Sequence, residues 1–187
     1  MSNMKIRVMP REAILDLLAP GSVGAEIGVH LGNFSARILK VVQPAKLHLI
    51  DPWTVFEDEG HENSWYGTKT VTQSEMDQRH QSVVKRFAAA PEVDVVRDFG
   101  AAAAAKFDDG YFDWVYIDGD HSYEGVTADI AAYAPKLKKN GLLLGDDYAM
   151  NGWWKRGVID AFHEALATKE FNIEFKIGNQ IALKKLV

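Results

Sequence analysis

The stretch FDWVYIDGDHSYEG (residues 112–125) decides the fold. It begins with a mostly apolar run, which is typical of a buried strand, and then breaks into Asp118, Asp120 and His121 within four positions. Continuous apolar strands are typical of parallel sheets that helices cover on both faces. The stretch therefore predicts a core strand whose carboxyl end opens into a polar loop.

Similar apolar runs recur along the chain, and helical patterns separate them. Strands that alternate with helices of this length indicate βαβ units and a parallel sheet. A run of alanines within residues 100–107 predicts a further, short helix. The expected strands are 24–29, 46–53, 93–99, 112–119 and 141–148, and the helical stripes are Met76, Val83, Val84 and Phe87, then Val126, Ile130 and Leu137, then Val158, Ile159, Phe162 and Leu166.

The C-terminal part follows a different pattern. Residues 171–186 form two strand-like runs joined at Gly178-Asn179, a good tight-turn pair, which predicts an antiparallel hairpin at one edge of the sheet. The fold class is thus α/β: a Rossmann-like seven-stranded sheet, mostly parallel with an antiparallel C-terminal hairpin, and helices on both faces. We expect one domain over residues 1–187, in which residues 1–22 are a lead-in with an N-terminal helix.

Composition excludes several classes of protein. The chain has 187 residues and no cysteine, which removes disulfides, thiolate zinc sites and a cysteine nucleophile. A net charge of −5 with no basic run argues against a nucleic-acid partner. No segment has the roughly 20 apolar residues of a membrane helix, and the N-terminus lacks the apolar run of a secretory signal. We expect a cytoplasmic protein with no membrane partner.

Acidic residues gather where the predicted strands end. Ligands of open parallel sheets bind beyond the carboxyl ends of the strands. Aspartate is also common in turns, so one such ending means little, but five strands in succession indicate a functional site. The residues at these ends are Glu26, Gly28, Asp51, Asp98, Asp118, Asp120, Asp146 and Asp147.

The loop after the first strand carries the spacing Glu-x-Gly-x-x-x-Gly over Glu26, Gly28 and Gly32. A glycine in this turn lets a ligand approach the backbone, and Asn33 could cap the following helix. A nicotinamide site would want G-x-G-x-x-G to seat a pyrophosphate. Glu26 would instead repel pyrophosphate and suit a ligand with an ammonium group.

The next two strand ends extend this cofactor hypothesis. Asp51 lies 23 residues after Gly28, where an acidic residue hydrogen-bonds a ribose diol. Asp98 and Phe99 end the third strand and could face an adenine ring. Residues of this kind would suit a cationic, phosphate-free nucleoside, and S-adenosylmethionine is such a ligand.

With these residues in place, the chain resembles the class I S-adenosylmethionine-dependent methyltransferases over nearly its whole length. It is most similar to small O-methyltransferases related to the cation-dependent macrolide-sugar enzymes, and more distantly to catechol-type enzymes. The family's first motif matches Glu26-Ile27-Gly28, its ribose-binding acid falls on Asp51, and the terminal hairpin matches its reversed seventh strand.

The resemblance also implies a magnesium site, with Asp118, Asp146 and Asp147 as ligands and Asp118 beside the cofactor. Magnesium takes oxygen ligands, and a bound substrate hydroxyl would lose its proton more readily. Since adjacent strand residues point to opposite faces, the chain must already leave the strand at Asp146. Alternatively, Asp118 serves only the cofactor and Asp147 only braces its loop.

Two residues compete for the role of general base. Relatives place a histidine or lysine three residues beyond the first metal ligand, which is His121 here, or use an acid two residues beyond it, which is Asp120. Histidine suits proton transfer near neutral pH. The plainer alternative is that His121 only hydrogen-bonds Asp118 or a backbone carbonyl.

Residues 54–72 are too polar and too rich in glycine for a core element, and a loop of this length predicts a mobile active-site lid. Its His61, Trp65 and Tyr66 could cover an acceptor.

The neighbouring Trp153 and Trp154 do not share a face of a regular element, so at most one packs easily into the core. The other could stack on a flat acceptor, bury in a homo-oligomer interface, or pack on the domain's own surface. The sequence leaves the oligomeric state open.

The function that these residues favour is magnesium-dependent O-methylation of a small molecule. Alternatives are a metal-independent N- or C-methyltransferase and a non-enzymatic S-adenosylmethionine-binding protein. A Rossmann oxidoreductase is disfavoured by Glu26 and by the missing glycine motif.

Overall fold

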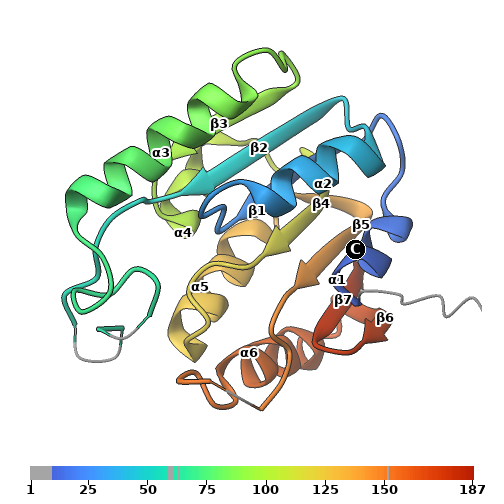
Figure 1. The fold of residues 1–187 in the computed structure, drawn as a ribbon. Helices are drawn as coiled ribbons and strands as arrows, with labels where there is room; N and C mark the ends of the chain where they lie inside the picture. Colours follow the sequence, from blue (N-terminus) through green and yellow to red (C-terminus); the bar gives the residue numbers. More distant parts are fainter. Residues whose placement is uncertain (1–9, 59–60, 63, 151) are drawn as a thin grey trace, which may run out of the picture.

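Seven strands form one mixed sheet in a computed structural model, which describes residues 10–58, 61–62, 64–150 and 152–187. The strand order is β3-β2-β1-β4-β5-β7-β6, and every neighbouring pair is parallel except the two that involve β7 (Figure 1). The sequence prediction of the fold class is confirmed. The strands are β1 (Val23–Ile27), β2 (Lys46–Asp51), β3 (Val93–Arg97), β4 (Phe112–Ile117), β5 (Leu137–Gly145), β6 (Phe171–Ile177) and β7 (Gln180–Lys185).

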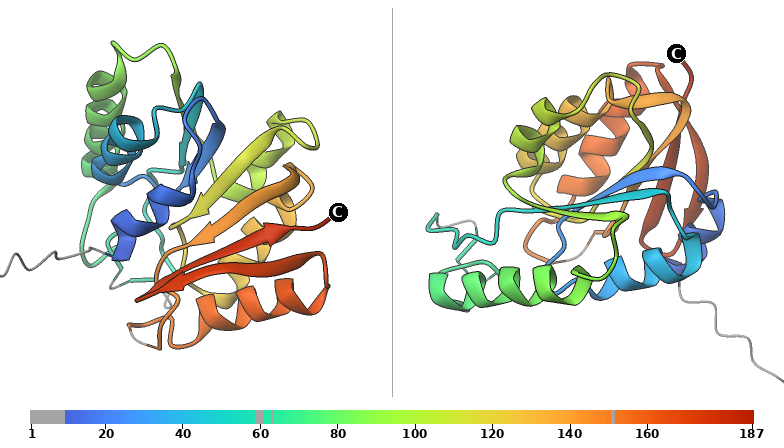
Figure 2. Two further views of the ribbon diagram at one scale, coloured as in Figure 1. Left: turned by 90° about the vertical axis from the view of Figure 1, so that its right-hand side faces the viewer. Right: turned by 90° about the horizontal axis from the view of Figure 1, so that it is seen from above.

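Helices cover both faces of this sheet, as the two further views show (Figure 2). Two separate apolar clusters lie between the sheet and its helices, one on each face. One face carries α1 (Pro10–Ala13), the 3-10 helix η1 (Ile14–Leu17), α2 (Asn33–Val42) and α3 (Gln73–Phe87), and the other carries α4 (Gly100–Ala103), the 3-10 helix η2 (Ala104–Lys106), α5 (Tyr123–Tyr133) and α6 (Gly157–Ala167).

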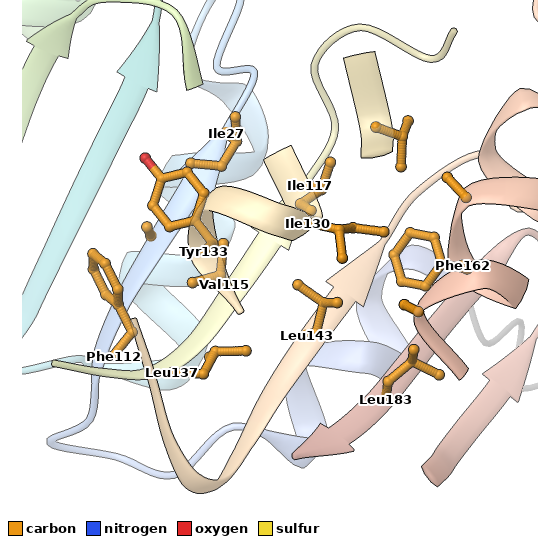
Figure 3. Close-up of a cluster of buried hydrophobic side chains, with 14 of the residues drawn as sticks. Ile27, Phe112, Val115, Ile117, Ile130, Tyr133, Leu137, Leu143, Phe162 and Leu183 are labelled. Atoms are coloured by element: carbon orange, nitrogen blue, oxygen red, sulfur yellow. The ribbon is translucent and has the colours of Figure 1, made fainter. Parts of the chain in front are cut away.

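The apolar character of β4 follows from this layering. Its side chains alternate between the two clusters, so Val115 packs towards α5 and α6 while Tyr116 packs towards α2. Figure 3 shows part of the α5 and α6 side, where Val115 lies with Ile130 of α5 and Phe162 of α6. A strand buried on both faces has few solvent-facing positions, which explains why β4 is apolar apart from the partly exposed Asp113.

The structure corrects three details of the predicted elements. The strand expected at 141–148 begins earlier, at Leu137, which was assigned to a helical stripe. Val84 of α3 is exposed rather than buried with its stripe. Asn33 begins α2 but its side chain caps nothing, and it accepts a hydrogen bond from Arg86 instead (2.8 Å). The terminal hairpin and the short helix within residues 100–107 are confirmed.

The strand order reverses between β1 and β4, and ligands of such sheets bind at this point. The predicted lid, 54–72, lies beside it and holds an isolated bridge between Phe56 and Gly67, and its residues 59, 60 and 63 lie outside the described residues. So do residues 1–9 of the lead-in. None of the helices in the described part of the chain is long and apolar enough to cross a membrane.

Candidate active site

A cavity of about 810 Å³ opens at the carboxyl ends of the parallel strands. Its size falls in the range of small-molecule sites, roughly 300–1,000 Å³. Residues that follow β1, β2, β3, β4 and β5 line it, including residues of the predicted lid, which is the loop after β2. Acidic residues dominate the charged part of the lining: Glu26, Asp51, Asp118, Asp120, Asp129, Asp146 and Asp147, against Arg11 as the one arginine or lysine among the described lining residues.

Gly28 permits the close approach of β1 and β4 at the floor of this cavity. Its φ of 90° is a conformation that side chains rarely adopt, and an added Cβ would overlap the carbonyl of Asp118. Its N–H donates to the carbonyl of Ile50 (2.9 Å), which ties the turn to β2. Gly32, also predicted to bind cofactor, precedes α2 and packs near Phe87 rather than lining the cavity.

The carboxyl group of Glu26 lies in the cavity wall at the end of β1 and is only 1% exposed. The hydroxyl of Ser35 on α2 donates to it. Burial raises the pKa of Glu26 to about 8, although the Ser35 hydrogen bond opposes this shift. A buried carboxyl of this kind is a favourable partner for an ammonium group.

Asp51 ends β2 and organises the turn after β1. One of its oxygens accepts the backbone N–H groups of Val29 (2.8 Å) and His30 (2.9 Å) and the hydroxyl of Tyr66 (2.6 Å), and the other accepts the N–H of Trp53 (2.7 Å). Burial raises the pKa of Asp51, while these hydrogen bonds lower it. Tyr66 belongs to the predicted lid, so the lid is linked to the predicted ribose-binding acid.

The two residues predicted to face adenine separate in the structure. Asp98 accepts hydrogen bonds from Lys106 (2.9 Å) and from the N–H of Phe99, and it does not line the cavity. Phe99 does line it, with an exposed ring that lies parallel to that of Phe56 (6.2 Å between centroids). The placement therefore gives no support to a role of Asp98 in cofactor binding.

Two of the three predicted metal ligands pair with an arginine. Asp118 follows β4, and Asp146 and Asp147 follow β5, which ends at Gly145, so the chain leaves the strand as expected. The guanidinium of Arg11, from α1, contacts the acids that follow both strands: Nη2 pairs with Asp118, and Nη1 lies 3.1 Å from Asp146.

Amide groups of the terminal hairpin occupy the other side of these acids. The side-chain amide of Asn179 donates to Asp146 (3.1 Å) and Asp147 (2.9 Å), and that of Gln180 donates to Asp146. Asp147 has a left-handed backbone (φ 51°), which turns its carboxyl group away from the direction of β5. Asp146 and Asp147 thus both accept hydrogen bonds from side-chain amides of the hairpin.

This arrangement does not fit a magnesium ion. Among the residues that the structure describes, no group of three or more histidine, cysteine, aspartate or glutamate side chains is placed to hold a metal. The cation between Asp118 and Asp146 is a guanidinium, and amide donors take the oxygens that a metal would need. The magnesium site implied by the resemblance stays a prediction that these contacts do not support.

His121 lies between the two groups of carboxylates. Its Nε2 is 3.5 Å from Asp118 and 3.5 Å from Asp147, it makes no hydrogen bond, and its ring packs beside Trp154 (5.0 Å between centroids). Burial works against the charged imidazole, but Asp118, followed by Asp147 and Asp146, raises the pKa of His121 above its usual value.

Asp120 has a bracing role in the same loop. One oxygen accepts the N–H of Ser122 (2.9 Å) and lies 3.0 Å from Nε2 of His61, and the other accepts the Ser122 hydroxyl (2.9 Å). Ser122 in turn caps α5. These contacts shape the start of α5 and join it to the predicted lid, which leaves Asp120 less free than His121 to take a proton.

An aromatic rim surrounds the entrance of the cavity. Both tryptophans line the cavity: Trp153 is 38% exposed and meets His61 edge-on (4.7 Å between centroids), whereas Trp154 is half-buried. Trp65 of the lid is exposed beside His30. Asn151, which precedes the tryptophans, lies outside the described residues.

Sequence reasoning missed several residues of the site, and one had a readable signal. Asp129 lies on the buried stripe of α5, between Val126 and Tyr133, where an acid is unexpected. It accepts the N–H of Ala101, and burial raises its pKa to about 7. The others are Arg11, Asn179 and Gln180, whose partners lie far away in the sequence, and the contact of Tyr66 with Asp51 was not predicted either.

Comparison with known proteins points in one direction. The sequence model of a family described as a methyltransferase domain matches residues 25–148, about two thirds of the chain. The match runs from the first strand through the acids that follow β5. No curated protein matches the chain in sequence.

Solved structures share the fold at low sequence identity. A protein from Corynebacterium glutamicum is 16% identical with a TM-score of 0.67, over 97% of this chain and 82% of that one. A candidate caffeoyl-CoA O-methyltransferase from Staphylococcus aureus is 14% identical (TM-score 0.67; 97% and 85% covered). A candidate ribosomal RNA methylase from Clostridium thermocellum is 12% identical (TM-score 0.65; 97% and 99% covered). At these identities the likeness concerns the fold alone.

Proposed function

The chain belongs to the class I S-adenosylmethionine-dependent methyltransferases, and from that premise we propose that it methylates a hydroxyl group of a small molecule. The observation that carries the proposal is the position of His121, whose Nε2 faces the cavity side of Asp118 and Asp147 without a hydrogen bond of its own. An imidazole held in this way is suited to accept the proton of an acceptor hydroxyl.

The strand ends supply groups that fit the cofactor. S-adenosylmethionine, when bound, supplies an electrophilic methyl group on a sulfonium centre. The carboxyl group of Glu26 would hold its ammonium group, and Asp51 would accept hydrogen bonds from its ribose hydroxyls, with the Tyr66 hydroxyl yielding or sharing its place. Gly28 keeps the floor between β1 and β4 narrow enough for both acids to face one ligand.

His121 would act as the general base and Asp120 as a positioning residue. The acceptor oxygen would form a bond to the methyl carbon while the bond from that carbon to sulfur breaks and leaves a thioether, and the acceptor proton would pass to Nε2 of His121. Asp118 and Asp147 lie on either side of this nitrogen, so they would orient the imidazole and stabilise the imidazolium that forms. Such a base contributes about 10²–10⁴-fold to turnover.

A small molecule is the acceptor class that the site favours. Carboxylates dominate the charged lining, so a polyphosphate chain would be repelled from the cavity. The aromatic rim of Trp65, Trp153 and Trp154 offers flat apolar surfaces of the kind that bind rings. Residues 54–72 would open for the acceptor to enter, since Tyr66 and His61 close over the acids.

Magnesium dependence is a finer form of this proposal. It requires the guanidinium of Arg11 to leave Asp118 and Asp146 before a metal can bind. A metal-independent reaction requires no such change, and the contacts favour it.

The experiment that tests the function is a transfer assay with methyl-labelled S-adenosylmethionine and a panel of phenols, catechols, sugars and amines. We expect a methyl ether product, and His121→Ala should lower turnover about 100-fold or more while the affinity for S-adenosylhomocysteine stays near that of wild type. His163→Ala, on the exposed face of α6, is the matched control. Exclusive methylation of amines or carbon would refute O-methylation, and tight cofactor binding without any transfer would favour a non-enzymatic binding protein.

A further inference from the structure

The guanidinium of Arg11 bridges the two strand ends that frame the proposed acceptor site. Different nitrogens contact different acids: Nη2 pairs with Asp118 after β4, and Nη1 lies 3.1 Å from Asp146 after β5. The residues involved are more than a hundred positions apart in the sequence. The contact therefore joins the N-terminal helix to the centre of the sheet at the wall of the cavity.

The fold holds this guanidinium in place from several directions. It lies over the ring of Phe34 (4.2 Å to the centroid) and near that of Tyr116 (5.5 Å). The helical turn behind it is anchored in the core by Ile14, which is fully buried. Glu12, which follows Arg11 in the sequence, pairs with Arg37 of α2 (2.8 Å). The side chain of Arg11 is thus held in place by several contacts of the fold, unlike a side chain that extends freely into solvent.

Charge balance explains why a cation is needed there. Three neighbouring carboxylates repel one another strongly unless a positive charge lies among them. Burial disfavours the charged guanidinium, but the charge of Asp118, together with that of Asp146, keeps the pKa of Arg11 above its ordinary value. Asn179 donates hydrogen bonds to the remaining oxygens of Asp146 and Asp147.

We infer that Arg11 is the resident cation of this site and takes the place that a divalent metal has in cation-dependent relatives, so that methyl transfer proceeds without metal. This inference rests on the proposed function of the same site. Arg11 acts as a positioning residue, because it fixes Asp118 and Asp146 and, through Asp118, the imidazole of His121.

The absence of a Lewis acid selects the class of acceptor. A guanidinium never gives up its charge and cannot bind an alkoxide as a metal does. The imidazole of His121 must then take the acceptor proton alone, and a phenolic hydroxyl with a pKa of about 10 gives up its proton more readily than an aliphatic alcohol. The acceptor is a phenol, which agrees with the aromatic rim.

The first test is calorimetric titration with magnesium chloride, and with manganese as a second probe, on wild type, Arg11→Met, Arg11→Lys and Glu12→Gln. Wild type, Arg11→Lys and Glu12→Gln should show no binding at millimolar metal, and Arg11→Met should gain a site that Asp146→Asn removes again. Glu12→Gln is the matched control, because it loosens the same helix without removing the cation.

The results separate this inference from the proposed function. Titration of S-adenosylhomocysteine into each protein reports the cofactor site, and its failure in wild type would count against the function and not against Arg11. Metal binding by wild type, lost in Asp118→Asn, would overturn the inference. An Arg11→Met variant that still binds S-adenosylhomocysteine but gains no metal site would also overturn the inference. The wild-type titration decides even if Arg11→Met does not fold.

A second readout uses the acceptor panel in the presence of a chelator. Phenols should be methylated at the same rate with and without the chelator, and aliphatic alcohols should react more slowly than phenols. Loss of phenol methylation in chelator, restored by magnesium, would overturn the inference and would leave O-methylation intact.

Discussion

Binding of the cofactor would change the protonation state of the Glu26 carboxyl group. It is buried at the end of β1, and burial raises its pKa to about 8, with further increases from the charges of Asp118 and Asp51 and a decrease from Arg11. In the ligand-free protein this carboxyl group therefore holds a proton at neutral pH. An ammonium group placed beside it would favour the carboxylate, so binding would release the proton.

This linkage predicts a pH dependence of cofactor affinity. Below the pKa of about 8 the proton must leave Glu26 before a cation can pair with it, so affinity for S-adenosylmethionine should fall as pH falls. The decrease should approach tenfold per pH unit between pH 7 and pH 6. Calorimetry at pH 6 and pH 7, in two buffers of different ionisation enthalpy, would measure both the affinity and the number of protons released.

Glu26→Gln provides the control for this measurement, because it keeps the shape of the side chain and cannot titrate. It should bind the cofactor more weakly than wild type at pH 7, and its affinity should depend less on pH between the two values. Equal wild-type affinities at pH 6 and pH 7, with no proton release, would contradict the expected role of Glu26.

At the residue scale, sequence predicted acids best where local pattern fixes their place. Glu26, Asp51 and Asp118 each follow an apolar run, so the end of the strand places them at the cavity. Arg11 and Tyr66 could not be found in this way, because each reaches its acid through tertiary packing of a separate element. Asp98 differs from these acids: it ends its strand as expected, but it pairs locally with Lys106 and lies outside the cavity, so its role in cofactor binding stays a prediction.

At the scale of elements, the start of α3 fixes the far end of the predicted lid. Thr72 and Glu75 form a capping box: the Thr72 side chain accepts from the N–H of Glu75 (3.3 Å), and the Glu75 side chain accepts from the N–H of Thr72 (2.8 Å). These contacts satisfy two of the backbone donors that a helix start leaves unpaired. The segment 54–72 therefore ends at a defined point.

Thr72→Ala removes one half of this box and should lower the free energy of unfolding by about 1 kcal/mol. The measurement is the urea midpoint at an unchanged slope. Ser82→Ala, later in α3, is the control: its hydroxyl only bonds back to the carbonyl of Gln78, and alanine favours the helix, so stability should not fall. An unchanged midpoint for Thr72→Ala would show that the lid and α3 do not depend on the cap.

Prediction of the elements succeeded where composition and pairing agree. The terminal hairpin combines two β-rich runs with a glycine turn, and both signals are local. The early start of β5 could not be read in the same way. Its first residues include Lys138, Lys139 and Asn140, and Asn140 has a left-handed backbone (φ 64°), so the sequence resembles a loop. Pairing of Leu137 with Phe112 of β4 brings them into the sheet regardless.

At the scale of the whole molecule, the distribution of charge indicates which partners are expected. The net charge is −5, and seven of the 26 acidic residues line the cavity at the edge of the sheet where ligands bind. The fold is shared with a candidate ribosomal RNA methylase, but a common fold does not carry a substrate with it. A nucleic-acid enzyme needs basic groups that neutralise phosphates around its cavity. The described lining offers Arg11 as its one arginine or lysine, and Asp118 and Asp146 already neutralise it.

We therefore expect the protein not to bind RNA. Fluorescence anisotropy with labelled transfer RNA and a ribosomal RNA fragment should show no binding at physiological salt, and lowering the salt should not produce it, because phosphates meet a surface of the same sign. Titration of S-adenosylhomocysteine into the same sample should proceed as without RNA, which shows that the protein is competent. Micromolar binding that weakens with added salt would contradict the small-molecule acceptor and would point to a basic surface outside the cavity.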